Sequence, residues 1–240
     1  MSRLLVAGGP VIPNFGKPNA CLKNNGWFCT QWIHAHWHDI LQPALIQHIQ
    51  LVVIAVAIGF AISFPLAVIG YRLSPLDPVL GVFSDFLYTV PSIAFFLLLV
   101  PLTGVTVTTV EVALVSFTLF IFYRNIVVGL RSVPPDVLES ARGMGMTRRQ
   151  TFWRVELPLA KPAIFAGLRI ATVATISIAT LAAFLIQDGL GAPIFDALGT
   201  PDLFHTELLT AGGLAVLLAL TADFLLGGLQ HALTPWTRVR

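Results

Sequence analysis

The sequence predicts an all-α membrane protein with about five transmembrane helices and one polar, helix-forming loop between two of them. Hydrophobic residues make up 56% of the chain, charged residues only 11%, and the mean hydropathy is +0.82. Soluble domains carry roughly 25% charged residues. Five segments supply the about 20 mostly apolar residues that a span requires: Ile46–Gly70, Val79–Val100, Val110–Leu130, Ala163–Ile186 and Leu208–Gly228.

These segments divide the chain into three parts. Residues 1–44 form an N-terminal tail, residues 45–233 a transmembrane domain with the loop 131–162, and residues 234–240 a C-terminal tail. The net charge is only +2, and the basic residues follow the ends of the spans instead of gathering on a solvated domain. We therefore expect a lipid bilayer, and no nucleic acid, around this chain.

The N-terminal tail is expected to stay on the chain and to lie against the membrane. Residues 1–13 hold one Arg and a short apolar run broken by glycine and proline, which is unlike a signal peptide. Three tryptophans before the first span are typical of an interfacial helix on the outer leaflet: Trp27, Trp32 and Trp37. The histidines of His34–His38 could instead bind a metal, but no carboxylate or thiol accompanies them at a recognised spacing.

Both cysteines of the chain, Cys21 and Cys29, lie in this tail. If the tail is extracytoplasmic, the two could form a disulfide, since such bonds persist in oxidising compartments. Two unpaired thiols are the alternative.

Charged residues interrupt the predicted spans. Glu111 and Arg124 leave only a short uncharged stretch in the third span, so their side chains must reach the interfaces or face protein. Asp85 and Asp223 lie inside or near spans. They could belong to a polar pore, but we favour helix ends near the headgroups.

The loop 131–162 is expected to form two short helices at an angle. Pro134 and Pro135 suit the start of a helix that runs to about Met144, and Gly145 suits a left-handed cap. Thr147-Arg148-Arg149-Gln150 fits a capping box that begins a second helix. Pro158 and Pro162 are expected to end this segment before the fourth span.

The distribution of Lys and Arg predicts the orientation. With the loop 131–162 inside, five spans place the N-terminus outside and the C-terminus inside. The inner side then holds eleven of the 14 basic residues, and the outer side holds three, Arg3, Lys17 and Lys23. This asymmetry agrees with the positive-inside rule. The outer loop from Gln187 to Thr206 contains three Asp and no basic residue.

The loop sequence resembles the E-A-A loop of ATP-binding-cassette (ABC) importer permeases. Glu-Ser-Ala at 139–141, Gly145 three residues later and Val-x-Leu-Pro at 155–158 match the family pattern E-A-A, three, G, nine, I-x-L-P. The resemblance implies a type I ABC importer permease fold in which a cytoplasmic coupling helix docks on an ATPase subunit. It assigns this role to seven residues: Glu139, Ser140, Ala141, Gly145, Val155, Leu157 and Pro158. We expect Glu139 and Ala141 to present the docking face.

Further runs resemble the osmoprotectant branch of these permeases, which transports glycine betaine, choline, carnitine or proline betaine. They include T-V-P-S-I-A at 89–94, Y-R-N at 123–125, A-R-G-M-G-M at 141–146 and T-L-A-A-F-L-I at 180–186. The likeness starts at about residue 48, and Glu111 departs from it. Candidate residues lining the pathway are Tyr88, Pro91, Ser92, Thr172, Thr175 and Thr180. Helix packing alone is the alternative role for the threonines.

The chain has no G-x-x-x-x-G-K-[ST] motif, so we expect no cofactor of its own and no enzymatic activity. ATP and Mg would be bound by a partner ATPase. The resemblance implies two ATPase subunits, a second permease subunit, identical or paralogous, and an extracytoplasmic solute-binding protein in a bacterial plasma membrane. A type I importer for another small solute, such as an amino acid, is the nearest alternative. An ion-coupled secondary transporter would require internal repeats and more ionisable residues at the midplane.

Overall fold

The computed structural model describes residue 21 and residues 24–238, and every regular element in this part of the chain is helical. The predicted all-α membrane fold is therefore confirmed. The expectation for residues 1–13 lies outside the described residues. So do four of the basic residues used for the orientation: Arg3, Lys17, Lys23 and Arg240.

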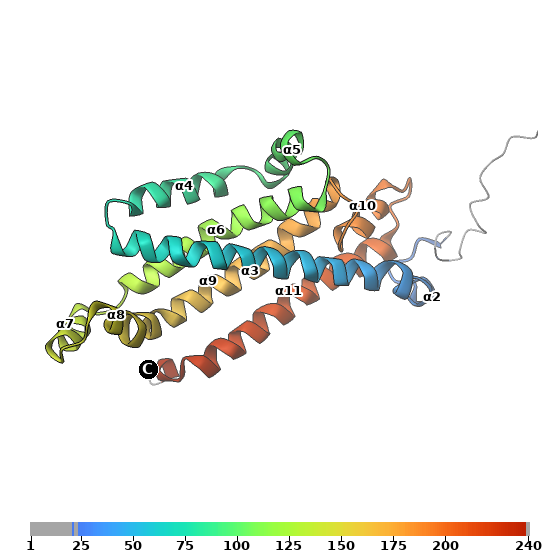
Figure 1. Ribbon diagram of the computed structural model, residues 1–240. Helices are drawn as coiled ribbons and strands as arrows, with labels where there is room; N and C mark the ends of the chain where they lie inside the picture. Colours follow the sequence, from blue (N-terminus) through green and yellow to red (C-terminus); the bar gives the residue numbers. More distant parts are fainter. Residues whose placement is uncertain (1–20, 22–23, 239–240) are drawn as a thin grey trace, which may run out of the picture.

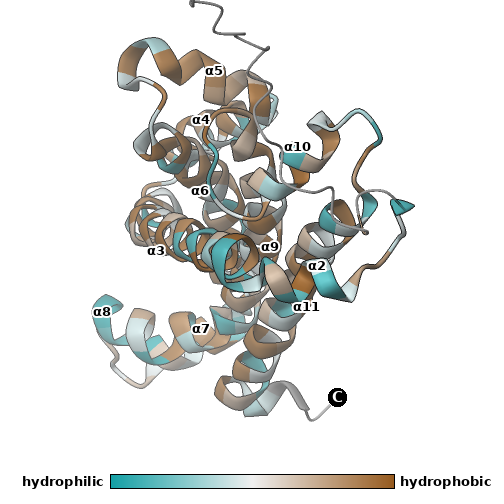
Figure 2. Ribbon diagram, turned by 90° about the vertical axis from the view of Figure 1, so that its right-hand side faces the viewer, coloured by the Kyte–Doolittle hydropathy of each residue, from teal (hydrophilic) through white to brown (hydrophobic). Residues whose placement is uncertain are grey.

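Four long helices lie alongside one another and form the body of the molecule (Figure 1). They are α3 (Gln42–Arg72), α6 (Val107–Arg131), α9 (Leu157–Leu181) and α11 (His205–Leu233). Each is long and apolar enough to cross a membrane. Figure 2 shows hydrophobic residues dominating these helices, with hydrophilic segments in the short helices at their ends.

The predicted second span, Val79–Val100, is not a straight helix. It is split into α4 (Asp77–Thr89) and α5 (Ser92–Thr103), which meet at an angle of 99°. The break follows from Pro91, because proline lacks an N–H and forces the preceding Val90 into an extended conformation with ψ 126°. The described residues thus contain four candidate spans, or five if the bent pair counts as one.

Helix α6 is the centre of the bundle, and it packs on α3, α4, α5 and α9. Small residues allow the closest approaches. A Cβ at Gly59 of α3 would lie 2.9 Å from Thr118 Cβ of α6, and a Cβ at Gly129 would lie 2.9 Å from Ala163 Cβ of α9. Close backbone contact through small residues is a principal source of helix association in membranes.

The loop 131–162 contains α7 (Pro135–Gly143), α8 (Arg148–Thr151) and the π-helical turn η2 (Phe152–Glu156). The prediction that Pro158 and Pro162 end this segment is wrong, because η2 continues directly into α9. Leu157 donates to Phe152 O, five residues back, so the helix takes a wider turn just before Pro158. Pro158 follows in the first turn of α9 and lacks a backbone N–H.

The opposite end of the bundle carries short helices from distant parts of the chain (Figure 1). The N-terminal segment forms α2 (Thr30–Ala35) and the π-helical turn η1 (Trp37–Leu41). The loop before α11 contains η3 (Ala182–Phe184) and α10 (Gly191–Gly199), and α10 was not predicted. The last described element, η4 (Pro235–Arg238), follows α11 near the end of the bundle that carries α7 and α8 (Figure 1).

The N-terminal segment is packed on protein more than expected for an interfacial helix. Trp32 is 95% buried and lies edge-on to Phe204, with ring centroids 5.2 Å apart. Trp27 remains largely exposed. Of the two alternatives for the cysteines, the structure has the disulfide between Cys21 and Cys29.

Candidate functional site

Helices α7 and α8 project from one end of the bundle (Figure 1) and form a compact unit, hereafter the knob (residues 135–151). Pro135 occupies the first turn of α7, and Asp136 is placed where the helix dipole favours a negative charge. Gly145 has φ +77°. Its N–H donates to Arg142 O at 2.9 Å, and Met146 N donates to Ala141 O at 3.1 Å. This pair of bonds is a Schellman motif, so the predicted left-handed cap is confirmed.

The second half of the knob begins with the predicted capping box. Gln150 N donates to Thr147 Oγ1 at 3.3 Å, and Thr147 N donates to Gln150 Oε1 at 2.8 Å. Both helix ends that face each other across residues 144–147 are therefore closed by hydrogen bonds. The turn between α7 and α8 has a defined geometry as a result.

The seven motif residues fall into two groups. Glu139, Ser140 and Gly145 are exposed on the knob, whereas Val155, Leu157 and Pro158 are half-buried where η2 enters α9. Ala141 is 1% exposed, so the expectation that it presents a docking face is wrong. Its methyl group packs inside the chain, where a larger side chain has no room.

An arginine-rich groove of about 760 Å³ separates the knob from the end of α3. Its charged lining residues are Arg72, Arg142, Arg148 and Glu156. The guanidinium of Arg72 also lies 4.8 Å from the centroid of the Phe152 ring, a cation–π contact that ties α3 to η2. The groove thus offers positive charge next to the exposed face of the knob.

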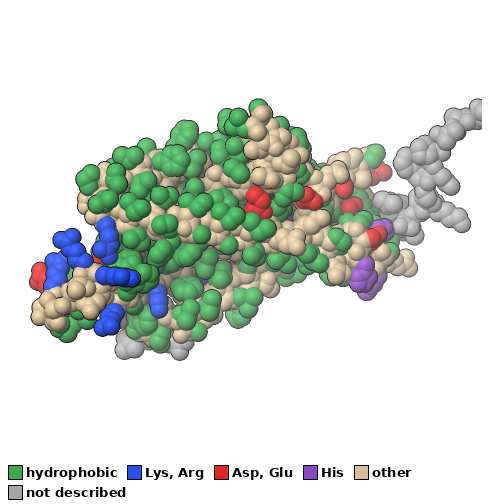
Figure 3. All heavy atoms as spheres, in the orientation of Figure 1, with side chains coloured by type: hydrophobic (Ala, Val, Ile, Leu, Met, Phe, Trp, Pro, Cys, Tyr) green, Lys and Arg blue, Asp and Glu red, His purple; other side chains and the backbone are tan. Residues whose placement is uncertain are grey.

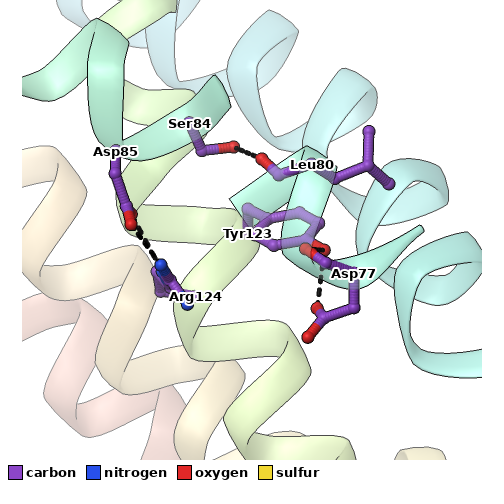
Figure 4. A network of polar contacts seen from close by, with 6 residues as sticks. All are labelled: Asp77, Leu80, Ser84, Asp85, Tyr123 and Arg124. Carbon is purple, nitrogen blue, oxygen red and sulfur yellow. Dashed lines mark hydrogen bonds and ion pairs between the residues drawn. The ribbon is translucent and has the colours of Figure 1, made fainter. Parts of the chain in front are cut away.

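Two aspartates of α4 bind residues of α6, as Figure 4 shows. Tyr123 donates its hydroxyl to Asp77 Oδ1 at 2.7 Å, and Arg131 donates to the other oxygen of Asp77 at 2.9 Å. Arg124 makes an ion pair with Asp85, with Nε 3.0 Å from Oδ1. The broken span is held to the central helix by these bonds.

The expectation that Asp85 and Asp223 mark helix ends is wrong. Asp85 lies within α4, and Asp223 lies within α11, where it pairs with Arg169 of α9. Each carboxylate is matched by a guanidinium from a neighbouring helix, which is how charges are tolerated at membrane depth. The sequence could not reveal these partners, because 39 and 54 residues separate them.

The candidate pathway residues lie in two different environments. Tyr88 is 47% exposed and stacks on Phe120 at 4.4 Å. Pro91 and Ser92 lie beside it, at the break between α4 and α5. The three threonines hydrogen-bond to carbonyls of their own helix, and Thr172 and Thr175 are buried. Tyr88, Pro91 and Ser92 therefore lie close together at the break. Thr172 and Thr175 lie apart from them, in the core of this chain.

Two polar residues of the bundle, His48 and Glu111, were given no functional role from the sequence. His48 is fully buried, with Nε2 3.2 Å from Ile176 O and Nδ1 3.3 Å from Leu190 N. A single histidine in an otherwise apolar span is the sequence feature that could have indicated a buried polar contact. Both carboxyl oxygens of Glu111 are buried and have no hydrogen-bond partner among the described residues.

No group of three or more His, Cys, Asp or Glu side chains within the described residues is arranged to hold a metal ion. In the His34–His38 segment, His36 Nδ1 pairs with Trp32 O at 2.9 Å and His38 Nδ1 pairs with Gln42 Oε1 at 2.7 Å. His36 follows α2 and bonds back to that helix, whereas the bond of His38 joins η1 to the first residue of α3.

The two ends of the bundle differ in charge. On the face seen in Figure 3, Lys and Arg gather around the knob, whereas most Asp and Glu and the His side chains lie toward the opposite end. A band of hydrophobic side chains separates them. This is the asymmetry that a membrane protein with its basic end in the cytoplasm would have.

Comparisons with known proteins all identify membrane components of transport systems. Residues 57–239 match the family described as "Binding-protein-dependent transport system inner membrane component". The "Osmoprotectant import permease protein OsmW" of Salmonella typhimurium is 39% identical over 196 residues, covering 79% of this chain and 89% of that protein. The "Carnitine transport permease protein OpuCB" of Listeria monocytogenes is 38% identical over 192 residues, covering 79% and 86%. The "Choline transport system permease protein OpuBB" of Bacillus subtilis is 36% identical over 191 residues, with the same coverage.

Among solved structures, the chain resembles an inward facing conformation of the MetNI methionine ABC transporter. The TM-score is 0.73 at 19% sequence identity, over 85% of this chain and 98% of that chain. At this identity the likeness establishes the fold alone. The fold is that of a type I ABC importer permease, as the resemblance of the loop had implied.

Proposed function

The chain belongs to the family of binding-protein-dependent transport system inner membrane components, and from that membership we propose what its importer carries and how its subunits meet. It is the membrane-spanning permease subunit of an ABC importer. The proposed substrates are quaternary ammonium osmoprotectants such as glycine betaine, choline or carnitine. The observation that carries this proposal is 36–39% identity, over most of both chains, to permeases named for carnitine, choline and osmoprotectants.

The chemistry of the broken span is compatible with such a substrate. A methylated ammonium ion is poorly hydrated and binds well to aromatic faces. The Tyr88–Phe120 stack stands at the break in the broken span, beside Pro91 and Ser92. In the described part of this region the acids Asp77 and Asp85 are already paired with arginines. Neither of these two carboxylates is free to replace the water of a strongly hydrated metal cation.

In this proposal the knob docks on a separate ATPase subunit that binds ATP and Mg. The knob is suited to docking because its two capped helices keep their shape without support from the bilayer. Its exposed face offers Glu139, Ser140 and Gly145, and Ala141 anchors α7 from within. The relatives in the comparison are transport permeases and not enzymes, and we assign no catalytic residue to this chain.

A second permease subunit, identical or paralogous, and an extracytoplasmic solute-binding protein complete the proposed complex. The pathway would run between the two permeases in a bacterial plasma membrane, with the N-terminus outside and the C-terminus inside. The exposure of α11 is consistent with a partner of this kind, because only 6% of the residues in its most apolar stretch are buried within this chain. The proposed assembly gives that surface a protein neighbour.

The substrate is tested by uptake under osmotic upshift. Cells that lack other osmoprotectant importers, with and without this chain, are given labelled glycine betaine, choline, carnitine or proline. Uptake of at least one quaternary ammonium compound should depend on the chain. Chain-dependent uptake of an amino acid, a sugar or a metal in its place would overturn the osmoprotectant assignment while leaving the permease role intact.

The docking role is tested by ATP hydrolysis in reconstituted vesicles. Gly145→Asn adds a side chain to the knob while tolerating the left-handed backbone, and Gly145→Trp adds a larger one. Both should reduce substrate-stimulated hydrolysis, with Trp the more severe. Gly199→Trp is the matched control, since a Cβ at Gly199 also meets no atom within 4 Å but lies at the opposite end of the molecule. Normal stimulation in the Gly145→Trp complex would contradict the docking role.

A further inference from the structure

The segment from Cys21 to Leu41 lies before the region that matches the family, which begins at residue 57. It is nevertheless joined to the outer loop and to α11. Cys21, Trp32 and Leu41 share a small hydrophobic core with Ala197 of α10 and Phe204. The segment therefore contacts the bundle through an apolar core that is separate from the main one.

The tightest connection comes from the short loop closed by the disulfide; its described residues, Cys21 and 24–29, are hereafter the clamp. Asn25 Nδ2 donates to Asp202 O at 2.6 Å and to Leu203 O at 3.2 Å. Its side-chain oxygen accepts a hydrogen bond from His205 N at 3.2 Å. One side chain thus satisfies three backbone groups that lie about 180 residues away.

The backbone of the clamp and an aromatic contact add to these bonds. Gly26 O accepts a hydrogen bond from Thr206 Oγ1 at 2.9 Å. Trp27 stacks on the ring of His205 at 4.8 Å. Asn25 has φ +39°, a left-handed conformation that asparagine adopts more readily than most residues. The disulfide closes the loop that contains Asn25, so it favours the conformation that presents this side chain.

The bound residues 202–206 comprise the last residues of the loop before α11 and the first two residues of that helix. Of its 29 residues, only Thr206, Ala211, Ala215 and Gly227 are buried. At the far end, Arg169 binds Asp223, and Gln230 donates to Pro162 O. Helix α11 also packs on α9 and α10, and the hydrogen bonds from the clamp hold its first turn and the end of the loop before it.

We propose that the clamp is a thiol-sensitive device: its disulfide fixes the outer end of α11, and reduction releases that end and slows transport. In the reaction, a dithiol reductant transfers two electrons and two protons. The Sγ–Sγ bond breaks, two cysteine thiols form, and the reductant becomes its own disulfide. Cys29 is half-buried whereas Cys21 is buried, so we expect the reductant to reach the bond from the side of Cys29. In an oxidising outer compartment the closed form is the stable one.

Hydrogen exchange of the assembled importer in detergent tests the structural part without requiring any transport. Complete reduction should speed hydrogen exchange at the amides of residues 203–208 by about tenfold or more. Opening the disulfide restores conformational entropy to the loop, and the corresponding free energy is at least as large as a tenfold change requires. Asn25→Gly keeps the left-handed backbone and removes the side-chain bonds, so it should have the same effect with the disulfide intact. Unchanged exchange after verified reduction would overturn the proposal.

Uptake in vesicles tests the functional part, which rests on the proposed function. The double variant Cys21→Ser/Cys29→Ser removes every cysteine of this chain, so it is an internal control for thiols elsewhere in the complex. Reductant should lower uptake by the parent complex several-fold and leave the variant at its already low rate. An equal response of both complexes would assign the effect to another subunit and overturn the proposal. If no osmoprotectant is taken up at all, the substrate assignment fails, and the exchange experiment still decides the clamp.

Discussion

Arg169 and Asp223 join α9 to α11 through two parallel hydrogen bonds, of 2.8 Å from Nε and 2.7 Å from the terminal nitrogen. The bonds use both carboxylate oxygens, which is the strongest geometry for an arginine–carboxylate pair. Gly227, one turn from Asp223, also faces the guanidinium, whose central carbon lies 3.5 Å from where a Cβ would be. Both residues lie beside an open apolar groove between the two helices.

We expect a single replacement of this pair to be more harmful than the double replacement. Asp223→Asn leaves the Arg169 charge without its partner at membrane depth, and Arg169→Gln does the same to Asp223. Arg169→Gln/Asp223→Asn removes both charges and keeps two groups that can hydrogen-bond. Melting temperatures of the purified complex measure the effects. Additive losses in the double variant would show that the two residues do not act as a pair.

A second prediction concerns orientation. Asp196 in α10 and Arg149 in the knob are both exposed and lie at opposite ends of the molecule. A membrane-impermeant thiol reagent added to intact cells should label Asp196→Cys and spare Arg149→Cys. The native cysteines do not react, because they form a disulfide. Permeabilised cells, in which both variants should be labelled, provide the control, and the reverse pattern in intact cells would invert the topology.

The closest helix contact gives a third prediction. Gly59→Ala would place a methyl group against Thr118 of the central helix, with the two Cβ atoms 2.9 Å apart. Overpacking of this kind costs about 1–3 kcal/mol of stability. Gly213→Ala is the matched control, since it lies in another span and meets no atom within 4 Å. Thermal unfolding should separate the two variants, and equal melting temperatures would mean that α3 and α6 can move apart freely.

The hydroxyl of Tyr123 gives the fourth prediction. Tyr123→Phe removes its hydrogen bond to Asp77 but leaves the Arg131 ion pair in place. The expected loss is about 1 kcal/mol, the usual contribution of one such bond. Tyr88→Phe keeps the stacking on Phe120 and should leave stability unchanged. If both variants unfold together with the parent, the bond between α4 and α6 does not stabilise the broken span.

Local features were predictable because their causes lie within a few residues. Gly145 and the Thr147–Gln150 box define helix ends by their own chemistry, so spacing in the sequence is enough. The four long spans follow in the same way from hydropathy over about 20 residues. The resemblance of the loop to the E-A-A pattern predicted the type of fold, which hydropathy alone does not.

Features that depend on distant residues were missed. Neither Arg169 nor Asp223 carries a sign of its partner, and a pairing across 54 residues appears only when the helices pack. The helix continues through Pro158 after a π-helical turn, which no residue pattern announces. Helix α10 was hidden because glycine and proline flank it, which made residues 187–206 look like an irregular loop.

The uninterrupted helix from Arg148 to Phe184 has a mechanical consequence. It contains 37 residues, so at 1.5 Å per residue it is about 55 Å long. One end begins in the knob and the other lies beside α10, on the far side of the apolar band. If it tilts as a stiff rod about its knob end, a rotation of about 5° displaces the other end by roughly 5 Å, about one helical turn. The chain therefore contains a lever arm that can turn a small change of angle at one surface into a displacement of a whole helical turn at the other.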